Sequence, residues 1–283
     1  MKVKANAKIN LSLDVMGKRE DGYHDICMIL QEIDLCDYLD ISLNTTGKIS
    51  LTCNSADTGK EFDNIAYKAA KLFLEKAQNG YGCDMVLEKR IPVCAGLGGG
   101  SADAAAVLKT LNELCSNLFD MTTLMEMGLS LGADVPFCIM GGTAIARGIG
   151  EKLTPLYGIC EKWAVLIKPA INISTKDAYH KMDSAPYPHP DVDKAAQCIQ
   201  SGNMHGLYEA AGNCFEYVIG HEHSEIAKIK AHLMANGAEF AMMSGSGPTV
   251  YGLFESRDDA RKAFGSYDGS YSGGGIARLV INE

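Results

Sequence analysis

The sequence lacks the features that mark membrane, secreted and nucleic-acid-binding proteins. It has no uncharged apolar stretch of about 18 residues, the length at which a membrane-spanning helix is suspected. Residues 1–10, MKVKANAKIN, lack the apolar run of a signal peptide, so we expect a cytoplasmic protein. Lysine and arginine form no cluster and the formal net charge is −9, whereas nucleic-acid binders are usually basic. The sequence therefore argues against DNA and membrane surfaces as partners, but not against a phosphate ligand that backbone N–H groups bind.

The ten cysteines form neither a disulfide framework nor a metal-binding pattern. They are scattered along the chain, with no CxxC pair and no metal-ligand spacing. Most lie in apolar strand or helix patterns, where a reduced cysteine behaves as a small hydrophobic residue. We therefore expect structural free thiols in a reducing compartment.

Apolar and polar residues alternate over residues 8–15, which predicts a half-buried strand. Further strands are expected over residues 25–35, 39–43, 49–53 and 84–89. Helices are expected over residues 63–78, with Asp63 as the N-cap, over residues 102–115, and over residues 122–131, where Gly132 would end the helix.

The pattern breaks near residues 154–158, and a second group of elements follows. Strands are expected over residues 163–168, 239–243, 249–254 and 276–281, with a helix over residues 258–264 and further helical stretches before it. The proline-rich residues 186–190 predict a loop, because a residue before proline is disfavoured in a helix. This order of elements predicts an α+β fold in two domains, residues 1–155 and 156–283.

A glycine-rich turn, residues 92–106 (PVCAGLGGGSADAAA), follows a predicted strand and opens a predicted helix. Glycines let the backbone turn tightly and approach a ligand closely. Successive N–H groups, added to the positive end of the helix dipole, form an anion site. The residues that we expect to form this phosphate-binding anion site are Pro92, Val93, Cys94, Ala95, Gly96, Leu97, Gly98, Gly99, Gly100, Ser101 and Ala102.

Two better-known phosphate loops do not fit this turn. A Walker A loop ends in Gly-Lys-Ser/Thr, and no lysine stands at the end of this one. A dinucleotide fingerprint needs a short turn in an alternating βαβα series, and here the turn follows several strands. From the residues alone, a glycine-rich loop without a ligand remains open.

Three segments together resemble the GHMP kinases. They are residues 7–11 (AKINL), the glycine-rich turn, and residues 244–249 (SGSGPT), in the family's order. The resemblance implies an N-terminal ATP-binding domain like the second domain of ribosomal protein S5 and a C-terminal ferredoxin-like domain. It further implies an active site in the cleft between the two domains, and ATP and Mg²⁺ as cofactors.

Asp21-Gly22-Tyr23-His24 is similar to a segment of those GHMP kinases that phosphorylate the 2-hydroxyl of cytidine-diphosphate-linked methylerythritol in the non-mevalonate route to isoprenoids. Residues 8–11, 96–105 and 132–137 also follow their pattern. The resemblance implies that Tyr23 and His24 read the cytosine ring, that Tyr179 covers its opposite face, and that Asn10 contacts the substrate. From the residues alone, residues 21–24 are a turn between two strands.

The resemblance also implies a catalytic pair. Asp134 would be the general base that takes the proton of the attacking hydroxyl, and Lys8 would keep that carboxylate ionised. Read alone, Asp134 is a turn residue before Pro136, and Lys8 a solvated strand lysine. Ser101 could offer its hydroxyl to Mg²⁺, but many relatives carry a second serine where this chain has Ala102.

Two other functions compete with this interpretation. A mevalonate-route GHMP kinase would have no reason for Tyr23 and His24 to read a base. A non-catalytic sensor on the same fold would bind ATP without turnover, and the presence of both Lys8 and Asp134 argues against it. We expect a small-molecule substrate and no obligate protein partner.

Overall fold

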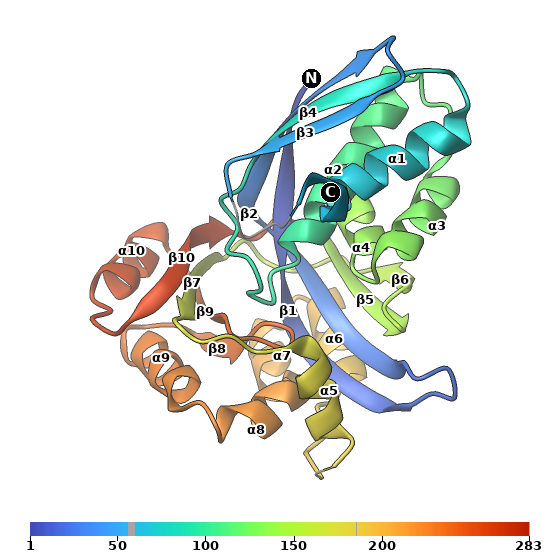
Figure 1. Ribbon diagram of the computed structural model, residues 1–283. Helices are drawn as coiled ribbons and strands as arrows, with labels where there is room; N and C mark the ends of the chain where they lie inside the picture. The colour runs from blue at the N-terminus through green and yellow to red at the C-terminus, as the bar shows by residue number, and fades with distance from the viewer. Residues whose placement is uncertain (56–59, 185, 283) are drawn as a thin grey trace. The chain divides into compact units, whose positions relative to one another are not determined.

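The computed structural model describes residues 1–55, 60–184 and 186–282 (Figure 1). The chain divides into two compact units. The first unit comprises Met1–Ala7, Cys36–Val93 and Gly98–Met140, and the second comprises Lys8–Leu35, Cys94–Leu97 and Gly141–Glu283. Strands β1 (Lys2–Lys18) and β2 (His24–Asn44) contribute residues to both units. Both units combine strands with helices, which confirms the predicted α+β class.

The first unit places helices against a small sheet (Figure 1). The later part of β2 pairs antiparallel with β4 (Gly82–Glu88), and β4 pairs parallel with β3 (Ile49–Cys53). Among its described residues, the helical elements are η2 (Glu61–Asp63), α1 (Ile65–Ala77), α2 (Gly99–Leu114), α3 (Met121–Leu131) and α4 (Val135–Met140).

An alanine-rich contact between α1 and α2 forms much of the first unit's core. Ala66, Ala69 and Ala70 of α1 and residues 104–106 of α2 are buried in one hydrophobic cluster. Small side chains let two helix backbones approach closely, so the start of α2 is held firmly against its neighbour. The glycine-rich turn leads directly into this helix.

The second unit contains two sets of paired strands. The early part of β2 pairs with β5 (Thr143–Gly148), which pairs with β6 (Lys152–Pro155). A separate antiparallel sheet has the order β10 (Tyr271–Arg278), β7 (Trp163–Pro169), β9 (Val250–Phe254) and β8 (Phe240–Met243).

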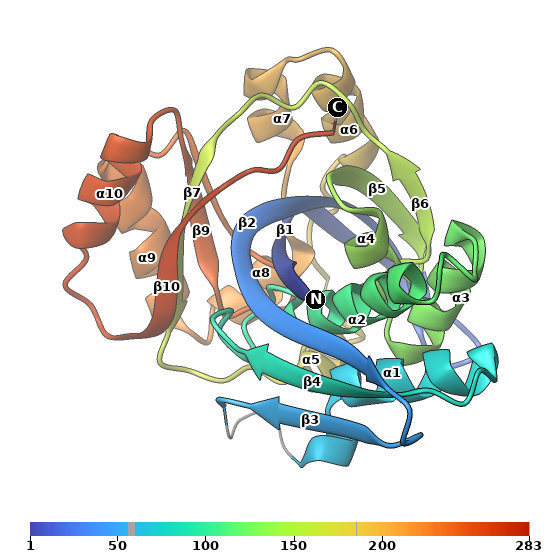
Figure 2. The same ribbon diagram turned by 90° about the horizontal axis from the view of Figure 1, so that it is seen from above.

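The described part of the second unit contains six helices. Figure 2 shows two of them, α9 and α10, beside the four-stranded sheet, and both contact its strands. Their bounds, in chain order, are α5 (Thr175–Met182), α6 (Val192–Gln200), α7 (Met204–Ala210), α8 (Cys214–Gly220), α9 (Ser224–Ala235) and α10 (Arg257–Gly265).

The prediction that residues 8–15 form a half-buried strand was wrong about burial. These residues lie within β1, but the polar Asn10, Ser12 and Asp14 are buried as fully as their apolar neighbours. Each has a polar partner inside the second unit: Ser12 Oγ, for example, donates to the Gly212 carbonyl at 3.2 Å. The alternation of apolar and polar residues in this part of β1 therefore reflects two buried strand faces of different polarity. Neither face is exposed to solvent.

Other boundaries also differ from those predicted. The strands expected over residues 25–35 and 39–43 are one continuous strand, β2, because Asp37 is a buried strand residue and not a break. The N-cap of α1 is Asn64, whose side chain accepts from the Ala66 N–H, and not Asp63, which ends η2. The short elements β5, β6 and α4 were not predicted.

Several predictions are confirmed. The strand over residues 49–53 is β3, the strand over residues 163–168 lies within β7, and residues 186–190 have no regular secondary structure. Each of the ten cysteines is a free thiol. Within the described part of the chain, no helix combines the length and apolar character needed to cross a bilayer.

Candidate active site

The glycine-rich turn uses left-handed backbone at two glycines and then enters α2. Gly96 and Gly98 have φ of 73° and 68°, values that side-chain-bearing residues rarely adopt. Helix α2 begins at Gly99, three residues before its predicted start, and its first bond runs from the Ala102 N–H to the Gly98 carbonyl at 2.9 Å. The first N–H groups of a helix have no partner within it, so the turn presents a row of donors for an anion.

Packing as well as backbone conformation requires the glycines at the helix start. A Cβ at Gly99 would lie 3.0 Å from Ile91 Cγ2, and one at Gly100 would lie 3.3 Å from Ile65 Cγ2. Both contacts are tighter than ordinary van der Waals separations. The glycines therefore let the helix start pack closely against the end of β4 and the start of α1.

The second unit brings together the three segments that carried the family resemblance. Ser244 Oγ donates to the Gly96 carbonyl at 2.9 Å, and the Asn10 N–H donates to Ser244 Oγ at 3.3 Å. The Lys8 N–H donates to the Leu97 carbonyl at 3.0 Å. Residues from the start, middle and end of the chain thus converge on the first half of the glycine-rich turn.

Lys8 is a buried residue of the second unit. Lys8 is only 5% exposed. Its Nζ donates a hydrogen bond of 2.9 Å to Asn10 Oδ1. The alternative that Lys8 is a solvated strand lysine is therefore wrong. A buried ammonium requires polar partners, and Asn10 supplies one of them.

Asp134 lies in the first unit, between α3 and α4. Its carbonyl accepts the Cys138 N–H at 3.1 Å, as expected for the residue that precedes a helix. A Cβ at the nearby Gly132 would lie 3.9 Å from Ser101 Oγ, so the turn before Asp134 adjoins the start of α2. Since Lys8 belongs to the second unit, its pairing with Asp134 stays a prediction.

The predicted base-reading residues lie in the second unit. The His24 and Tyr179 rings are stacked, with centroids 4.7 Å apart and planes inclined by 25°. The His24 side chain is only 8% exposed, whereas Tyr23 is 61% exposed. Tyr23 sits in a turn in which its N–H donates to Asp21 Oδ1 at 3.0 Å. The structure thus brings His24 and Tyr179 together and leaves Tyr23 at the surface.

A cluster of buried charged side chains lies next to the start of α2 and was not predicted from the sequence. Lys89 Nζ, on a side chain 6% exposed, donates to Asp103 Oδ2 at 2.7 Å and also contacts Asp37. The other oxygen of Asp37 accepts the Ile91 N–H at 2.8 Å. Lys89 Nζ would lie 3.3 Å from a Cβ at Gly99. The cluster therefore ties the end of β4 to the first turns of α2.

The charges of this cluster are not balanced, because one ammonium faces two carboxylates. Burial, reinforced by the neighbouring charge of Asp37, raises the pKa of Asp103 to about 7 despite the opposing effect of Lys89. The two carboxylates outweigh the effect of burial on the lysine and raise the pKa of Lys89. Asp103 Oδ1 has no hydrogen-bond partner in the part of the chain that the structure describes. Asp103 is thus the carboxyl group of the cluster that binds a proton up to about pH 7.

A signal for this cluster exists in the sequence. Asp103 interrupts a run of small apolar residues at the start of α2, a position where a charged side chain must be buried. A buried carboxylate requires a cation, and Lys89 directly follows strand β4. The pairing could have been proposed on these grounds.

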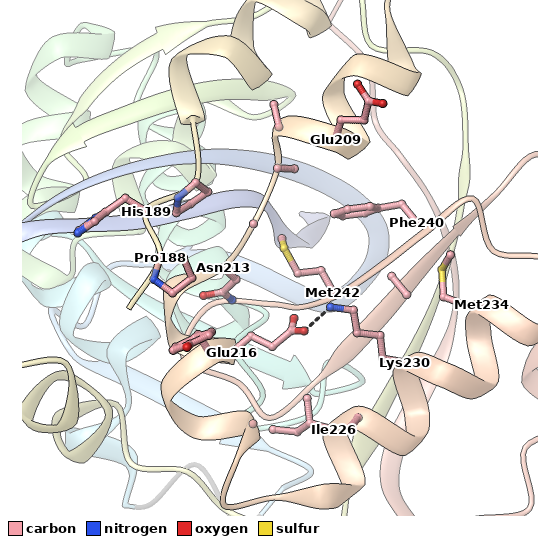
Figure 3. Close-up of a pocket in the computed structure, with 18 of the residues that line it drawn as sticks. Pro188, His189, Glu209, Asn213, Glu216, Ile226, Lys230, Met234, Phe240 and Met242 are labelled. Carbon is pink, nitrogen blue, oxygen red and sulfur yellow. Dashed lines mark hydrogen bonds and ion pairs between the residues drawn. The ribbon is translucent and has the colours of Figure 1, made fainter. Parts of the chain in front are cut away.

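A pocket of about 1010 Å³ in the second unit is separate from the predicted site residues. Its apolar wall includes Phe240 and Met242 of β8 and Met234 of α9 (Figure 3). Glu216 and Lys230 form an ion pair at this pocket. None of the residues predicted to bind ATP or substrate lines it.

Comparison with known proteins defines the class to which this fold and site belong. Residues 64–142 match the GHMP kinases N terminal domain, and residues 188–271 match the GHMP kinases C terminal. The first match contains the glycine-rich turn and Asp134. The chain belongs to the GHMP kinases, a family of ATP-dependent kinases.

Two relatives and one solved structure are similar to this chain over most of its length. The 4-diphosphocytidyl-2-C-methyl-D-erythritol kinase of Bacillus cytotoxicus is 46% identical, over 89% of this chain and 87% of that protein. The kinase of the same name from Alkaliphilus metalliredigens is 42% identical, over 93% of this chain and 91% of that protein. A crystal structure of 4-(cytidine 5'-diphospho)-2C-methyl-D-erythritol kinase has a TM-score of 0.83 and 33% identity, with both chains fully covered.

Proposed function

We propose that this enzyme transfers the γ-phosphoryl group of ATP to the 2-hydroxyl of 4-(cytidine 5'-diphospho)-2-C-methyl-D-erythritol. The observation that carries the proposal is the stacked His24–Tyr179 pair, with its ring centroids 4.7 Å apart. A kinase of the mevalonate route has no base for such a pair to read. The relatives from Bacillus cytotoxicus and Alkaliphilus metalliredigens, 46% and 42% identical, carry the name of the cytidine-linked kinase, which supports the same choice.

In this proposal the glycine-rich turn and the start of α2 bind the phosphates of ATP. The N–H groups of Gly99, Gly100 and Ser101 are the donors that the first helical turn leaves without an intrahelical partner. Together with the helix dipole they favour the negative charge of the ATP phosphates. Because phosphoryl transfer depends mainly on positioning and charge neutralisation, such a rigid donor row supplies much of the needed catalysis.

Proton transfer falls to Asp134 in this proposal. A carboxylate near the reacting hydroxyl accepts its proton as the phosphoryl group arrives, an effect of about 10²–10⁴-fold in rate. Lys8 keeps Asp134 ionised and polarises the acceptor oxygen. Its position in the second unit is fixed by the hydrogen bond to Asn10, which we propose also contacts the substrate.

The residues present fit a magnesium ion held largely by ATP. Mg²⁺ is commonly bound through one or two protein oxygens together with substrate phosphates. Ser101 supplies a hydroxyl, and among the described residues no cluster of three or more His, Cys, Asp or Glu side chains is arranged to hold a metal. When bound, the ion would neutralise phosphate charge. Ala102 adds no second hydroxyl, so in this chain Ser101 is the candidate hydroxyl ligand in the turn.

Two further proposals complete this assignment. We propose that the chain has two functional domains, residues 1–155 and 156–283, divided where the pattern of predicted elements breaks. A cytoplasmic location fits an enzyme that uses ATP. The substrate is a small molecule, and nothing in the proposed chemistry requires a protein or nucleic-acid partner.

An ADP-release assay tests this function. The protein, supplied with Mg²⁺ and ATP, is given either the cytidine-linked methylerythritol or mevalonate 5-phosphate. ADP release that depends on the cytidine-linked compound supports the proposal. Release only with mevalonate 5-phosphate would replace it with a mevalonate-route kinase, and nucleotide binding without release in either case would favour the non-catalytic sensor.

A further inference from the structure

The side chain of Asp183, at the end of α5, contacts one residue of β1 and one residue of β2. Its Oδ1 lies 2.7 Å from His24 Nε2, and its Oδ2 accepts a hydrogen bond of 2.7 Å from Lys18 Nζ. Asp183 is the C-cap residue of α5, which also carries Tyr179. All four residues belong to the second unit.

One helix thus holds the imidazole ring of His24 in two ways. Tyr179 and Asp183 are four residues apart, a spacing that places side chains on the same face of a helix. Tyr179 stacks on the ring, and Asp183 contacts its Nε2. Tyr179 is in turn held by an edge contact with Phe215, at 4.9 Å between centroids. The ring of His24 therefore has a defined orientation before any substrate binds.

The ionisation of Asp183 decides which nitrogen of His24 carries hydrogen. The hydrogen bond with His24, followed by that with Lys18, lowers the pKa of Asp183 to about 2. An ionised carboxylate can only accept hydrogen bonds, so Nε2 must be the donor in this contact. In neutral histidine the hydrogen then sits on Nε2, and Nδ1 is left as an acceptor.

We propose that Asp183 is a positioning residue that makes this kinase select a cytidine-linked over a uridine-linked substrate. With Nε2–H held by Asp183, Nδ1 of His24 accepts a hydrogen bond from the 4-amino group of cytosine. Uracil has a carbonyl oxygen at this position, so two acceptors would face each other and the contact would be lost. The inference rests on the proposed function, because it takes His24 as a reader of the base.

The test compares the kcat/KM values for cytidine- and uridine-diphosphate-linked methylerythritol. In Asp183→Asn the amide oxygen keeps the contact with Lys18 Nζ, so the amide nitrogen faces Nε2 and donates to it, which moves the hydrogen to Nδ1. In Asp183→Ala neither tautomer is held. We expect the preference for cytidine to fall by about tenfold or more in both variants, as for a lost hydrogen bond to a buried group. The KM for ATP should not change.

Two matched variants separate this effect from the loss of surface charge. Lys18→Gln removes the other contact of Asp183 but leaves His24 Nε2 bonded, and Asp177→Asn removes a charge from an exposed residue of the same helix. Both should retain the preference of the unmodified enzyme. ¹⁵N NMR of the histidine side chains, recorded without substrate, should show hydrogen on Nε2 of His24 in the unmodified protein and a shift toward Nδ1 in Asp183→Asn.

The outcomes for the inference and for the proposed function are distinct. If the unmodified enzyme phosphorylates the cytidine-linked compound and both Asp183 variants keep its full base preference, the role of Asp183 is overturned and the function stands. An unchanged His24 tautomer in Asp183→Asn would also overturn it. If the unmodified enzyme phosphorylates neither compound, the function itself fails.

Discussion

Ser244 Oγ donates a hydrogen bond of 2.9 Å to the carbonyl of Gly96, although 148 residues separate them in the chain. Each residue belongs to a glycine-rich turn, one before α2 and one between β8 and β9. A Cβ at Gly96 would lie 2.2 Å from the Ser244 carbonyl oxygen, so the two backbones are as close as glycine permits. The C-terminal turn therefore fixes the first half of the proposed phosphate-binding turn.

Gly96→Ala should disrupt this contact. Alanine is strained at a φ of 73°, and its Cβ would overlap the Ser244 backbone. We expect the free energy of unfolding, measured by denaturant titration, to fall by at least about 2 kcal/mol. Gly265→Ala is the control, because a Cβ there meets nothing within 4 Å; it should stay within about 0.5 kcal/mol of the unmodified protein. Equal stability of the two variants would show that the contact between the turns is loose.

Lys89→Met should destabilise the protein strongly. It leaves the buried carboxylates of Asp37 and Asp103 without their shared cation, and breaking a buried ion pair in this way costs about 3–5 kcal/mol. Arg90→Met is the matched control, because Arg90 is exposed and pairs with the exposed Glu88. It should cost about 1 kcal/mol or less. A loss at Lys89 as small as that at Arg90 would mean that the cluster does not hold the start of α2.

The stability of the protein should depend on pH through Asp103. Its pKa is raised to about 7 in the folded protein, whereas an unfolded aspartate titrates near 4. Between these values the folded state holds the extra proton, so the free energy of unfolding falls as pH rises from about 4 to about 7, by at most about 1.4 kcal/mol per pH unit. Above about pH 7 this contribution is constant.

Denaturant titration of Asp103→Asn at pH 5 and pH 8 isolates this effect. The asparagine cannot titrate, so the stability of the unmodified protein relative to the variant should be at least about 1 kcal/mol lower at pH 8 than at pH 5. A difference that stays the same at both pH values, or that changes in the opposite direction, would show that Asp103 is ionised throughout.

Asp134→Asn should separate catalysis from nucleotide binding. The amide cannot accept the proton of the substrate hydroxyl, so turnover in an ADP-release assay should fall by at least about a hundredfold. The affinity for ATP, measured by calorimetric titration, should stay within about twofold. Glu126→Gln, at an exposed position of the preceding helix α3, should leave both values unchanged. Turnover that survives in Asp134→Asn would remove Asp134 from the mechanism.

Strands and helices that depend on the local order of apolar and polar residues were predictable from the sequence. Residues 49–53 alternate over a whole strand, and α3 is bounded by Asp120 and Gly132. Helix α2 begins three residues before its predicted start, although glycine disfavours helix interiors. In the first turn, however, tight packing against Ile91 and Ile65 requires glycine. Tertiary contact outweighs intrinsic preference there.

The contacts between distant residues were not predictable in the same way. The burial of Lys8 depends on Asn10 and on a segment more than two hundred residues later, and strand alternation cannot show it. The continuity of β2 through Asp37 was not predicted, because the partners of this buried carboxylate lie just after β4. The glycine-rich turn was recognisable from composition and spacing, but its binding of phosphate stays a prediction. The roles of Asp134, Tyr23 and His24 came from family resemblance and also stay predictions.

The position of the transferred phosphate tests the central claim most directly. The 2-carbon of 2-C-methylerythritol carries a methyl group and no hydrogen, so a phosphate on its oxygen has no three-bond coupling to a proton. We predict that proton-coupled ³¹P NMR of the product shows a new monoester resonance as a singlet, with the diphosphate of the cytidine-linked compound retained. A monoester resonance split by protons would place the phosphate on another hydroxyl, and no new resonance in the presence of ATP and Mg²⁺ would contradict the proposed reaction altogether.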